Sequence, residues 1–264
     1  MDRYSSIGIF DSGIGGLTVM KEIAALMPSE SIVYLGDTAR VPYGTRSAET
    51  VRRYSFECAR FLMQHNIKLL VIACNTASAV SLDDIRMTID IPVIGVIEPG
   101  AKAALAAAPN RRIGVIGTEA TIKSSAYVKA IKALDSSAEV QGLACPLFVP
   151  LVEEGWTDGE VPRLAALRYL SGMSEKGIDA LVLGCTHYPL LKNIISQVMP
   201  DVELIDSAVE TARCVKETLA ASDMLNTGNS HSTKYFVTDS AERFVSVGER
   251  FLDKTITDIK IAVL

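Results

Sequence analysis

The chain has 264 residues, of which 48% are hydrophobic and 22% are charged, and these proportions are typical of a globular protein. Its formal net charge of −5 and its pI of about 5.3 argue against a large nucleic-acid-binding surface, but they are compatible with a small ligand. The first residues show no basic start followed by an apolar stretch, and no apolar segment approaches the ~20 residues of a membrane span. We therefore expect a cytoplasmic protein with neither a nucleic-acid nor a membrane partner.

Short apolar runs alternate with segments of helical periodicity along the chain, which predicts an α/β protein with mainly parallel sheets flanked by helices. Each run is rich in β-branched residues, as is typical of strands that are buried on both faces. The expected strands, in chain order, are 7–10, 32–35, 69–73, 93–96, 113–116, 140–143, 180–183, 202–205, 235–237 and 259–263.

The clearest helix is expected after Ser47, a candidate N-cap, because apolar residues between positions 51 and 62 recur at helical spacing. Cys58 lies on that apolar face and Cys214 belongs to a similar pattern, so we interpret both as packing residues. Cys145 falls in an expected loop, and no chemical role is assigned to it. Because the five cysteines are an odd number, we expect reduced thiols rather than a disulfide framework.

Two parts of the chain resemble each other in the order and spacing of their motifs. Residues 7–12 (I-G-I-F-D-S) resemble residues 113–118 (I-G-V-I-G-T), and each segment is followed about 70 residues later by a cysteine motif. We therefore expect two pseudosymmetric lobes, the first formed by residues 1–98 and 207–264 and the second by residues 99–206. A site in the cleft between the lobes is the natural consequence.

Cys74 and Cys185 stand in matching surroundings, since each follows a short apolar run and opens a polar segment. Ligands of α/β sheets bind at the carboxyl ends of the strands, so both thiols are expected at one cleft. A thiol can act as a base or an acid near neutral pH, and two thiols on opposite faces of a carbon suit removal and return of its proton. The pair predicts racemase or epimerase chemistry.

The segment D-S-G-I-G-G (11–16) follows the first expected strand, and its glycines allow backbone N–H groups to approach an anion. The segment matches neither the Walker A pattern nor the dinucleotide fingerprint. Asp11 is either a structural cap for the next helix or a carboxylate that relays the proton of a thiol, and the local sequence leaves both interpretations open. After the second strand, Tyr43 and Gly44 lie in a loop that is compatible with a turn or with a binding role.

Polar residues directly follow both cysteines. Asn75 and Thr76 are suited to hold a carboxylate or an ammonium group, or else to cap a helix. Thr186 and His187 place a hydroxyl and an imidazole beside the second thiol. Zinc is one alternative, but Cys-x-His without a second pair is poor ligand spacing, and we expect no metal. A hydrolase in which His187 activates the neighbouring cysteine is the stronger alternative, although it leaves the other cysteine unexplained.

Four motifs carry a family resemblance: F-D-S-G-I-G-G (10–16), G-D-x-A-R-V-P-Y-G (36–44), A-C-N-T-A-S (73–78) and G-C-T-H-Y-P-L-L (184–191). With these motifs the chain resembles the glutamate racemases, cofactor-independent enzymes that make D-glutamate for bacterial peptidoglycan. The resemblance covers the chain from about residue 7 to about residue 210. An aspartate racemase of the same superfamily and a binding protein without catalysis are the alternatives that remain.

The resemblance implies a thiolate–thiol pair, in which Cys74 deprotonates D-glutamate and Cys185 deprotonates L-glutamate. It further implies that Asp11 supports the first thiol, that His187 supports the second, and that Glu153 assists on the second side. Glutamate as substrate, the absence of a cofactor and a homodimer are implied in the same way. The implied substrate contacts are Asp11, Ser12, Tyr43, Gly44, Asn75, Thr76, Thr186 and His187.

Overall fold

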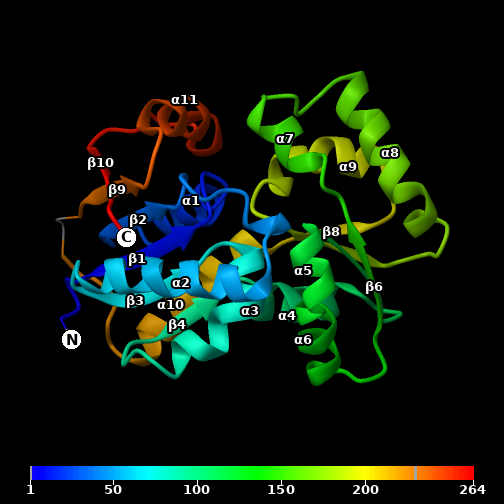
Figure 1. Ribbon diagram of the computed structural model, residues 1–264. Helices are drawn as coiled ribbons and strands as arrows, with labels where there is room; N and C mark the ends of the chain where they lie inside the picture. The colour runs from blue at the N-terminus through cyan, green and yellow to red at the C-terminus, as the bar shows by residue number, and fades with distance from the viewer. Residues whose placement is uncertain (1, 229–230) are drawn as a thin grey trace.

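The computed structural model describes residues 2–228 and 231–264, which form two β-sheets flanked by helices (Figure 1). Every strand pair in both sheets is parallel. The expected class, α/β with parallel sheets flanked by helices, is confirmed. Met1, Asn229 and Ser230, which the expected first lobe includes, lie outside the described residues.

The first sheet has the strand order β10-β9-β2-β1-β3-β4. Its central strands consist almost wholly of buried residues, as expected of apolar strands covered on both faces. The strands of this sheet are β1 (Ser6–Asp11), β2 (Ile32–Gly36), β3 (Ile67–Ile72), β4 (Val93–Gly95), β9 (Thr233–Val237) and β10 (Ile259–Ile261).

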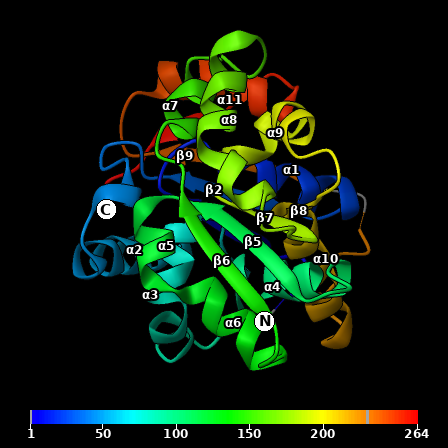
Figure 2. The same cartoon turned by 90° about the vertical axis from the view of Figure 1, so that its right-hand side faces the viewer.

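The second sheet has the strand order β6-β5-β7-β8 and faces the viewer in Figure 2. This order repeats that of β2-β1-β3-β4 in the first sheet, so β5 corresponds to β1 and β7 corresponds to β3. All ten expected strands form, and their ends differ from the expected positions by at most two residues. The strands of the second sheet are β5 (Arg112–Gly117), β6 (Glu139–Ala144), β7 (Ala180–Gly184) and β8 (Glu203–Asp206).

Helices connect the strands, and the last two return to the first sheet. The expected N-cap Ser47 is confirmed, since its side chain accepts a hydrogen bond from the Thr50 amide at the start of α2. The α-helices are α1 (Leu17–Leu26), α2 (Ala48–Met63), α3 (Asn75–Arg86), α4 (Ile97–Ala107), α5 (Glu119–Ser124), α6 (Ala126–Leu134), α7 (Phe148–Glu153), α8 (Glu160–Ser174), α9 (Lys192–Val198), α10 (Ser207–Ala221) and α11 (Ala241–Leu252), and two 3-10 helices are η1 (Tyr43–Thr45) and η2 (Tyr188–Leu191).

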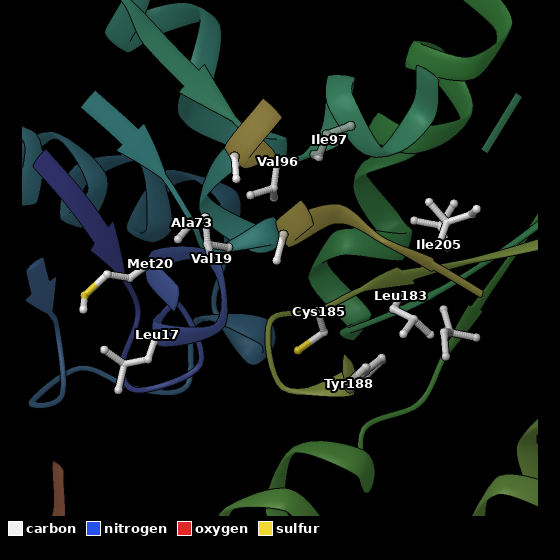
Figure 3. Packing of buried hydrophobic residues seen from close by; sticks show 14 of the residues in the cluster. Leu17, Val19, Met20, Ala73, Val96, Ile97, Leu183, Cys185, Tyr188 and Ile205 are labelled. Carbon is white, nitrogen blue, oxygen red and sulfur yellow. The ribbon is translucent and has the colours of Figure 1, made fainter. Parts of the chain in front are cut away.

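One hydrophobic cluster extends across both sheets. Leu17 and Met20 of α1 belong to it together with Leu183 of β7 and Cys185, which follows that strand (Figure 3). A second cluster, which includes Cys58, covers the other face of the first sheet. The packing of the first cluster therefore connects the two sheets directly, beside the strand end that carries Cys185.

The cysteines that were interpreted as packing residues differ in their burial. Cys58 is fully buried, whereas Cys214, in the middle of α10, is only partly buried and packs against the first cluster, so the interpretation is confirmed for Cys58 and only partly for Cys214. All five cysteines carry free thiols. None of the helices in the described part of the chain combines the length and the apolar character that a membrane span requires.

Candidate active site

The loops that follow the corresponding strands β3 and β7 bring Cys74 and Cys185 to the wall of one cavity. Its volume of about 40 Å³ has room for only a few water molecules. The cavity is also lined by seven residues that the sequence singled out: Ser12, Tyr43, Gly44, Asn75, Thr76, Thr186 and His187.

Cys74 lies directly before α3, and its thiol donates a hydrogen bond to Ser12 Oγ at 3.6 Å. Burial raises the pKa of the Cys74 thiol to about 12, and the nearby Asp11 carboxylate contributes in the same direction. Without a ligand, Cys74 is therefore a protonated thiol at neutral pH.

Asp11 is fully buried behind the cavity wall, at the end of β1. Its Oδ2 accepts a hydrogen bond from the Gly13 amide at 2.9 Å, and its Oδ1 accepts one from Thr186 Oγ1 at 3.5 Å. Burial raises the pKa of Asp11, although the charge of His187 opposes this shift. Gly16, and not Asp11, is the N-cap residue of α1. The Asp11 carboxyl accepts hydrogen bonds from backbone amides of the loop before that helix, at Gly13 and Gly16, and it also contacts the loop that follows β7.

The thiol of Cys185 contacts an imidazole, which in turn contacts a carboxylate. Its Sγ lies 3.9 Å from His187 Nδ1, and His187 Nε2 lies 3.2 Å from Glu153 Oε1. Burial disfavours the protonated imidazole, but the hydrogen bonds with Cys185 and Glu153 outweigh it and raise the pKa of His187 to about 10. At neutral pH the site thus holds an imidazolium between the thiol and the Glu153 carboxylate.

Glu153 ends α7 just outside the cavity wall, and its two carboxylate oxygens have different partners. Oε1 faces His187, while Oε2 lies 3.2 Å from a guanidinium nitrogen of Arg243 on α11. The hydrogen bond with His187 lowers the pKa of Glu153 against the effect of burial, and Arg243 lowers it further. Glu153 is therefore held as a carboxylate at neutral pH.

Gly15 explains part of the glycine-rich segment. A Cβ atom at this position would overlap with Thr186 Oγ1 and with the His187 ring. The missing side chain lets the loop after β1 pack directly against the loop after β7. This glycine thus serves a close approach between the two cysteine-bearing halves.

Asn75 and Thr76 begin α3 without capping it, since the N-cap residue is Cys74 and the helix has no side-chain cap. Thr76 Oγ1 lies 2.9 Å from Thr118 Oγ1, at the end of β5. Asn75 Oδ1 accepts a hydrogen bond from the Tyr127 hydroxyl at 2.7 Å, but its buried Nδ2 has no partner among the described residues. This nitrogen is an available donor for a ligand oxygen, because a buried polar atom normally has a partner.

Tyr43 reaches the site in a more limited way. Its hydroxyl donates a hydrogen bond to Asp37 Oδ2, and Asp37 is held in turn by Arg40 at 2.6 Å and by Thr238 at 2.9 Å. The phenol hydroxyl is therefore hydrogen-bonded inside the protein, beside the first sheet, and does not point to the cavity as a donor. Tyr43 contributes to the cavity wall through its other atoms, next to Gly44.

These groups form an acid–base site with two thiols and several hydrogen-bond donors. In residues 2–228 and 231–264, no group of three or more His, Cys, Asp or Glu side chains is arranged to hold a metal ion. Two thiols at the wall of one small cavity are able to remove a proton from a bound carbon and to return one.

The model of the Asp/Glu/hydantoin racemase family matches residues 7–215 of this chain. A glutamate racemase from Geobacter metallireducens is 57% identical over 261 residues, which cover 97% of this chain and 96% of the relative. This chain belongs to the glutamate racemase family.

Solved structures of glutamate racemases have the same fold. A glutamate racemase isoform from Bacillus anthracis matches with a TM-score of 0.96 and 41% identity, covering 99% of this chain and 98% of that chain. The glutamate racemase from Francisella tularensis, solved in complex with D-glutamate, matches with a TM-score of 0.94 and 40% identity over the same shares of both chains.

The sequence did not single out every residue of the site. Thr118 and Val149 line the cavity, and Tyr127 and Arg243 contact residues that belong to the site. Thr118 had a usable signal, because it occupies in residues 113–118 the position that Ser12 occupies in residues 7–12. The other three carry no local motif.

Proposed function

We propose that this chain interconverts L-glutamate and D-glutamate, with Cys74 and Cys185 acting on opposite faces of the α-carbon. The observation that carries this proposal is the presence of both thiols, from corresponding strand ends, at one cavity. One thiolate removes the α-hydrogen and the other thiol returns a proton, so the configuration inverts. The names of the relatives, and the D-glutamate in the Francisella tularensis complex, support glutamate as the substrate.

The α-hydrogen of an amino acid is a far weaker acid than a thiol, so the site must stabilise a carbanion-like transition state. Asn75 Nδ2, which has no partner among the described residues, and the hydroxyls of Thr76 and Thr186 are the donors that we assign to the substrate's oxygens. The cavity of about 40 Å³ is too small for glutamate, so it must widen for entry and then exclude water around the reacting carbon.

The two thiols have different partners in this mechanism. By the family resemblance, Cys74 takes the proton of D-glutamate and Cys185 takes that of L-glutamate. Asp11 is the acceptor that assists the first thiol. The imidazolium of His187, 3.9 Å from Cys185 Sγ, stabilises negative charge on the second thiol by Coulomb attraction, and Glu153 keeps that imidazole protonated.

Racemisation in D₂O tests this proposal. When the reaction starts from L-glutamate, the D-glutamate product should carry deuterium, while L-glutamate recovered early should stay largely unlabelled. The reverse direction should mirror this result. Equal early labelling of substrate and product would indicate a single base. Faster turnover of aspartate would support an aspartate racemase, and tight binding without turnover would support a binding protein.

We further propose that the reaction needs neither pyridoxal phosphate nor a metal, since two protein thiols supply the base and the acid. Extensive dialysis against a chelator should leave the rate of racemisation unchanged, and the visible spectrum should lack an absorbing cofactor. Activity that is lost on dialysis and restored by a metal or by pyridoxal phosphate would refute this part of the proposal.

The wider setting follows from the family resemblance. We propose that the chain acts in the cytoplasm as a homodimer, supplies D-glutamate for peptidoglycan, and has the lobe boundaries 1–98 with 207–264 and 99–206. Residue 98 lies in the first turn of α4, so the first boundary falls inside a helix. Light scattering tests the dimer, and dependence of growth on added D-glutamate after deletion of the gene tests the role.

A further inference from the structure

Helix α11 belongs by its packing to the first sheet, yet it reaches the acid–base groups of the second. Its buried Phe244 packs against the rings of Tyr34 and Tyr235, at centroid distances of 5.8 and 6.3 Å. Figures 1 and 2 both show α11 next to α7, the helix that ends at Glu153. The last turn of α11 also places Phe251 edge-on to the His187 ring, at a centroid distance of 5.5 Å.

Two arginines on one face of α11 hold Glu153. Arg243 donates to Glu153 Oε2 at 3.2 Å, and Arg250, two helical turns later, donates to the Glu153 backbone carbonyl at 2.8 Å. The second contact satisfies a carbonyl at the end of α7, where helical partners are missing. Gly155 adopts a φ of +79°, and a Cβ atom there would overlap with the Arg250 guanidinium.

The carboxylate of Glu153 therefore has both oxygens occupied, one by the imidazole of His187 and the other by Arg243. An unpaired carboxylate at the end of a six-residue helix has several rotamers, whereas a guanidinium on the far oxygen selects the one that faces His187. Glu153, which contacts the direct partner of Cys185, is thus oriented by a residue that packs on the first sheet.

We propose that Arg243 is a positioning residue, which fixes the Glu153 carboxylate against His187 and thereby supports proton transfer at Cys185 but not at Cys74. This inference rests on the proposed racemase function. The side chain of Arg243 does not line the cavity and is 56% exposed; besides Glu153, it lies 4.0 Å from the exposed Glu154 carboxylate, so its effect on the site is exerted through Glu153 and His187.

Rates alone cannot locate such an effect, because two enantiomers have equal free energy. The ratio of kcat/KM in the two directions therefore equals one for every variant. The isotope effect of an α-deuterium on kcat/KM does distinguish the sides, since it reports how far removal of the α-hydrogen limits the rate.

The decisive experiment uses Arg243→Met, which removes the charge and keeps an extended apolar side chain. We expect kcat/KM to fall on the order of tenfold in both directions, since small displacements of a catalytic group are costly. The α-deuterium isotope effect should rise for L-glutamate, whose hydrogen Cys185 removes. It should shrink for D-glutamate, because return of the proton by Cys185 then limits the rate.

The matched control is Arg213→Met on α10. Arg213 is exposed, lies outside the cavity, and pairs with Glu210 at an N–O distance of 2.8 Å. This variant should have wild-type rates and isotope effects, and both variants should unfold at nearly the wild-type temperature. Arg243→Lys, which keeps the charge, should recover part of the lost rate.

Wild-type rates and isotope effects in Arg243→Met would overturn the inference while leaving the proposed function intact. An α-deuterium isotope effect that changes in the same direction and by the same size for both enantiomers would also overturn it, since Arg243 would then act on both proton transfers. Failure of the wild-type protein to racemise glutamate would instead remove the proposed function itself, so the two failures are distinguishable.

Discussion

Cys74 and Cys185 follow corresponding strands of two sheets with the same strand order, but their neighbours are of opposite charge. The thiol of Cys74 bonds Ser12 and lies near the buried carboxyl of Asp11. The thiol of Cys185 bonds an imidazole that is held protonated by Glu153. The repeated backbone thus delivers two thiols to one cavity, while side chains that are not repeated give each thiol different acid–base partners.

This difference suits a reaction whose substrate and product are mirror images. The two enantiomers have equal free energies, but the protein around them is not mirror-symmetric, so the two proton transfers of the proposed mechanism need separate assistance. A carboxyl group lies beside one thiol and an imidazolium beside the other, and these are two different partners for the two thiols of the proposed mechanism.

The largest effect is expected from Cys74→Ser and Cys185→Ser, which remove one base each. A hydroxyl is too weak an acid and its conjugate base too scarce at neutral pH, so kcat/KM should fall by about 10³ or more in both directions. Circular dichroism of each enantiomer during turnover measures the rate.

The control for this comparison is Cys214→Ser, because Cys214 is half-buried on α10 and lies outside the cavity. This variant should keep the wild-type rate. Near-normal racemisation by Cys74→Ser or by Cys185→Ser would contradict the two-base reading.

A smaller effect, about 10- to 100-fold in kcat/KM, is expected from Asp11→Asn and from His187→Asn, since each removes the assistance to one thiol only. The α-deuterium isotope effect should rise for D-glutamate in Asp11→Asn and for L-glutamate in His187→Asn. The same direction of change in both variants would show that the two sides are not functionally separate.

Asn75→Ala should lower kcat/KM for glutamate about tenfold, mainly by raising KM. A hydrogen bond to a charged group contributes roughly 1.5–3 kcal/mol, and the donor Asn75 Nδ2 has no partner among the described residues. Steady-state kinetics with both enantiomers measures the change. Tyr127→Phe, which removes the hydrogen bond to Asn75 Oδ1 and leaves Nδ2 in place, should have the smaller effect. An equal effect would mean that the orientation of Asn75, and not its contact with the substrate, sets KM.

The sequence predicted the parts of this structure that depend on local patterns. All ten strands form because short β-branched runs suit burial on both faces, and the thiol positions follow from where β3 and β7 end. Arg243 was not predicted, because it lies 90 residues from Glu153 and only the packing of α11 brings the two together. The commitment of the Tyr43 hydroxyl to Asp37 is likewise a tertiary contact without a sequence signal.

The last prediction concerns stability, and it tests the surroundings of Cys185 without substrate. The pKa of His187 is about 10 in the folded protein because hydrogen bonds with Cys185 and Glu153 outweigh burial, whereas an unfolded histidine titrates near 6.5. Between these pH values the native state binds more protons than the unfolded state, so the stabilising contribution of His187 is complete below about pH 6.5. It is lost as the pH rises through about 10.

Urea unfolding of the wild type and of His187→Asn from pH 6 to pH 10 measures this contribution. The advantage of the wild type in free energy of unfolding should shrink steadily over that range. Cys214→Ser, which leaves these charges in place, should show no such narrowing against the wild type. An advantage that stays constant to pH 10 would mean that His187 is neutral in the folded protein, and the charge difference between the neighbours of the two thiols would then have to come from Asp11 alone.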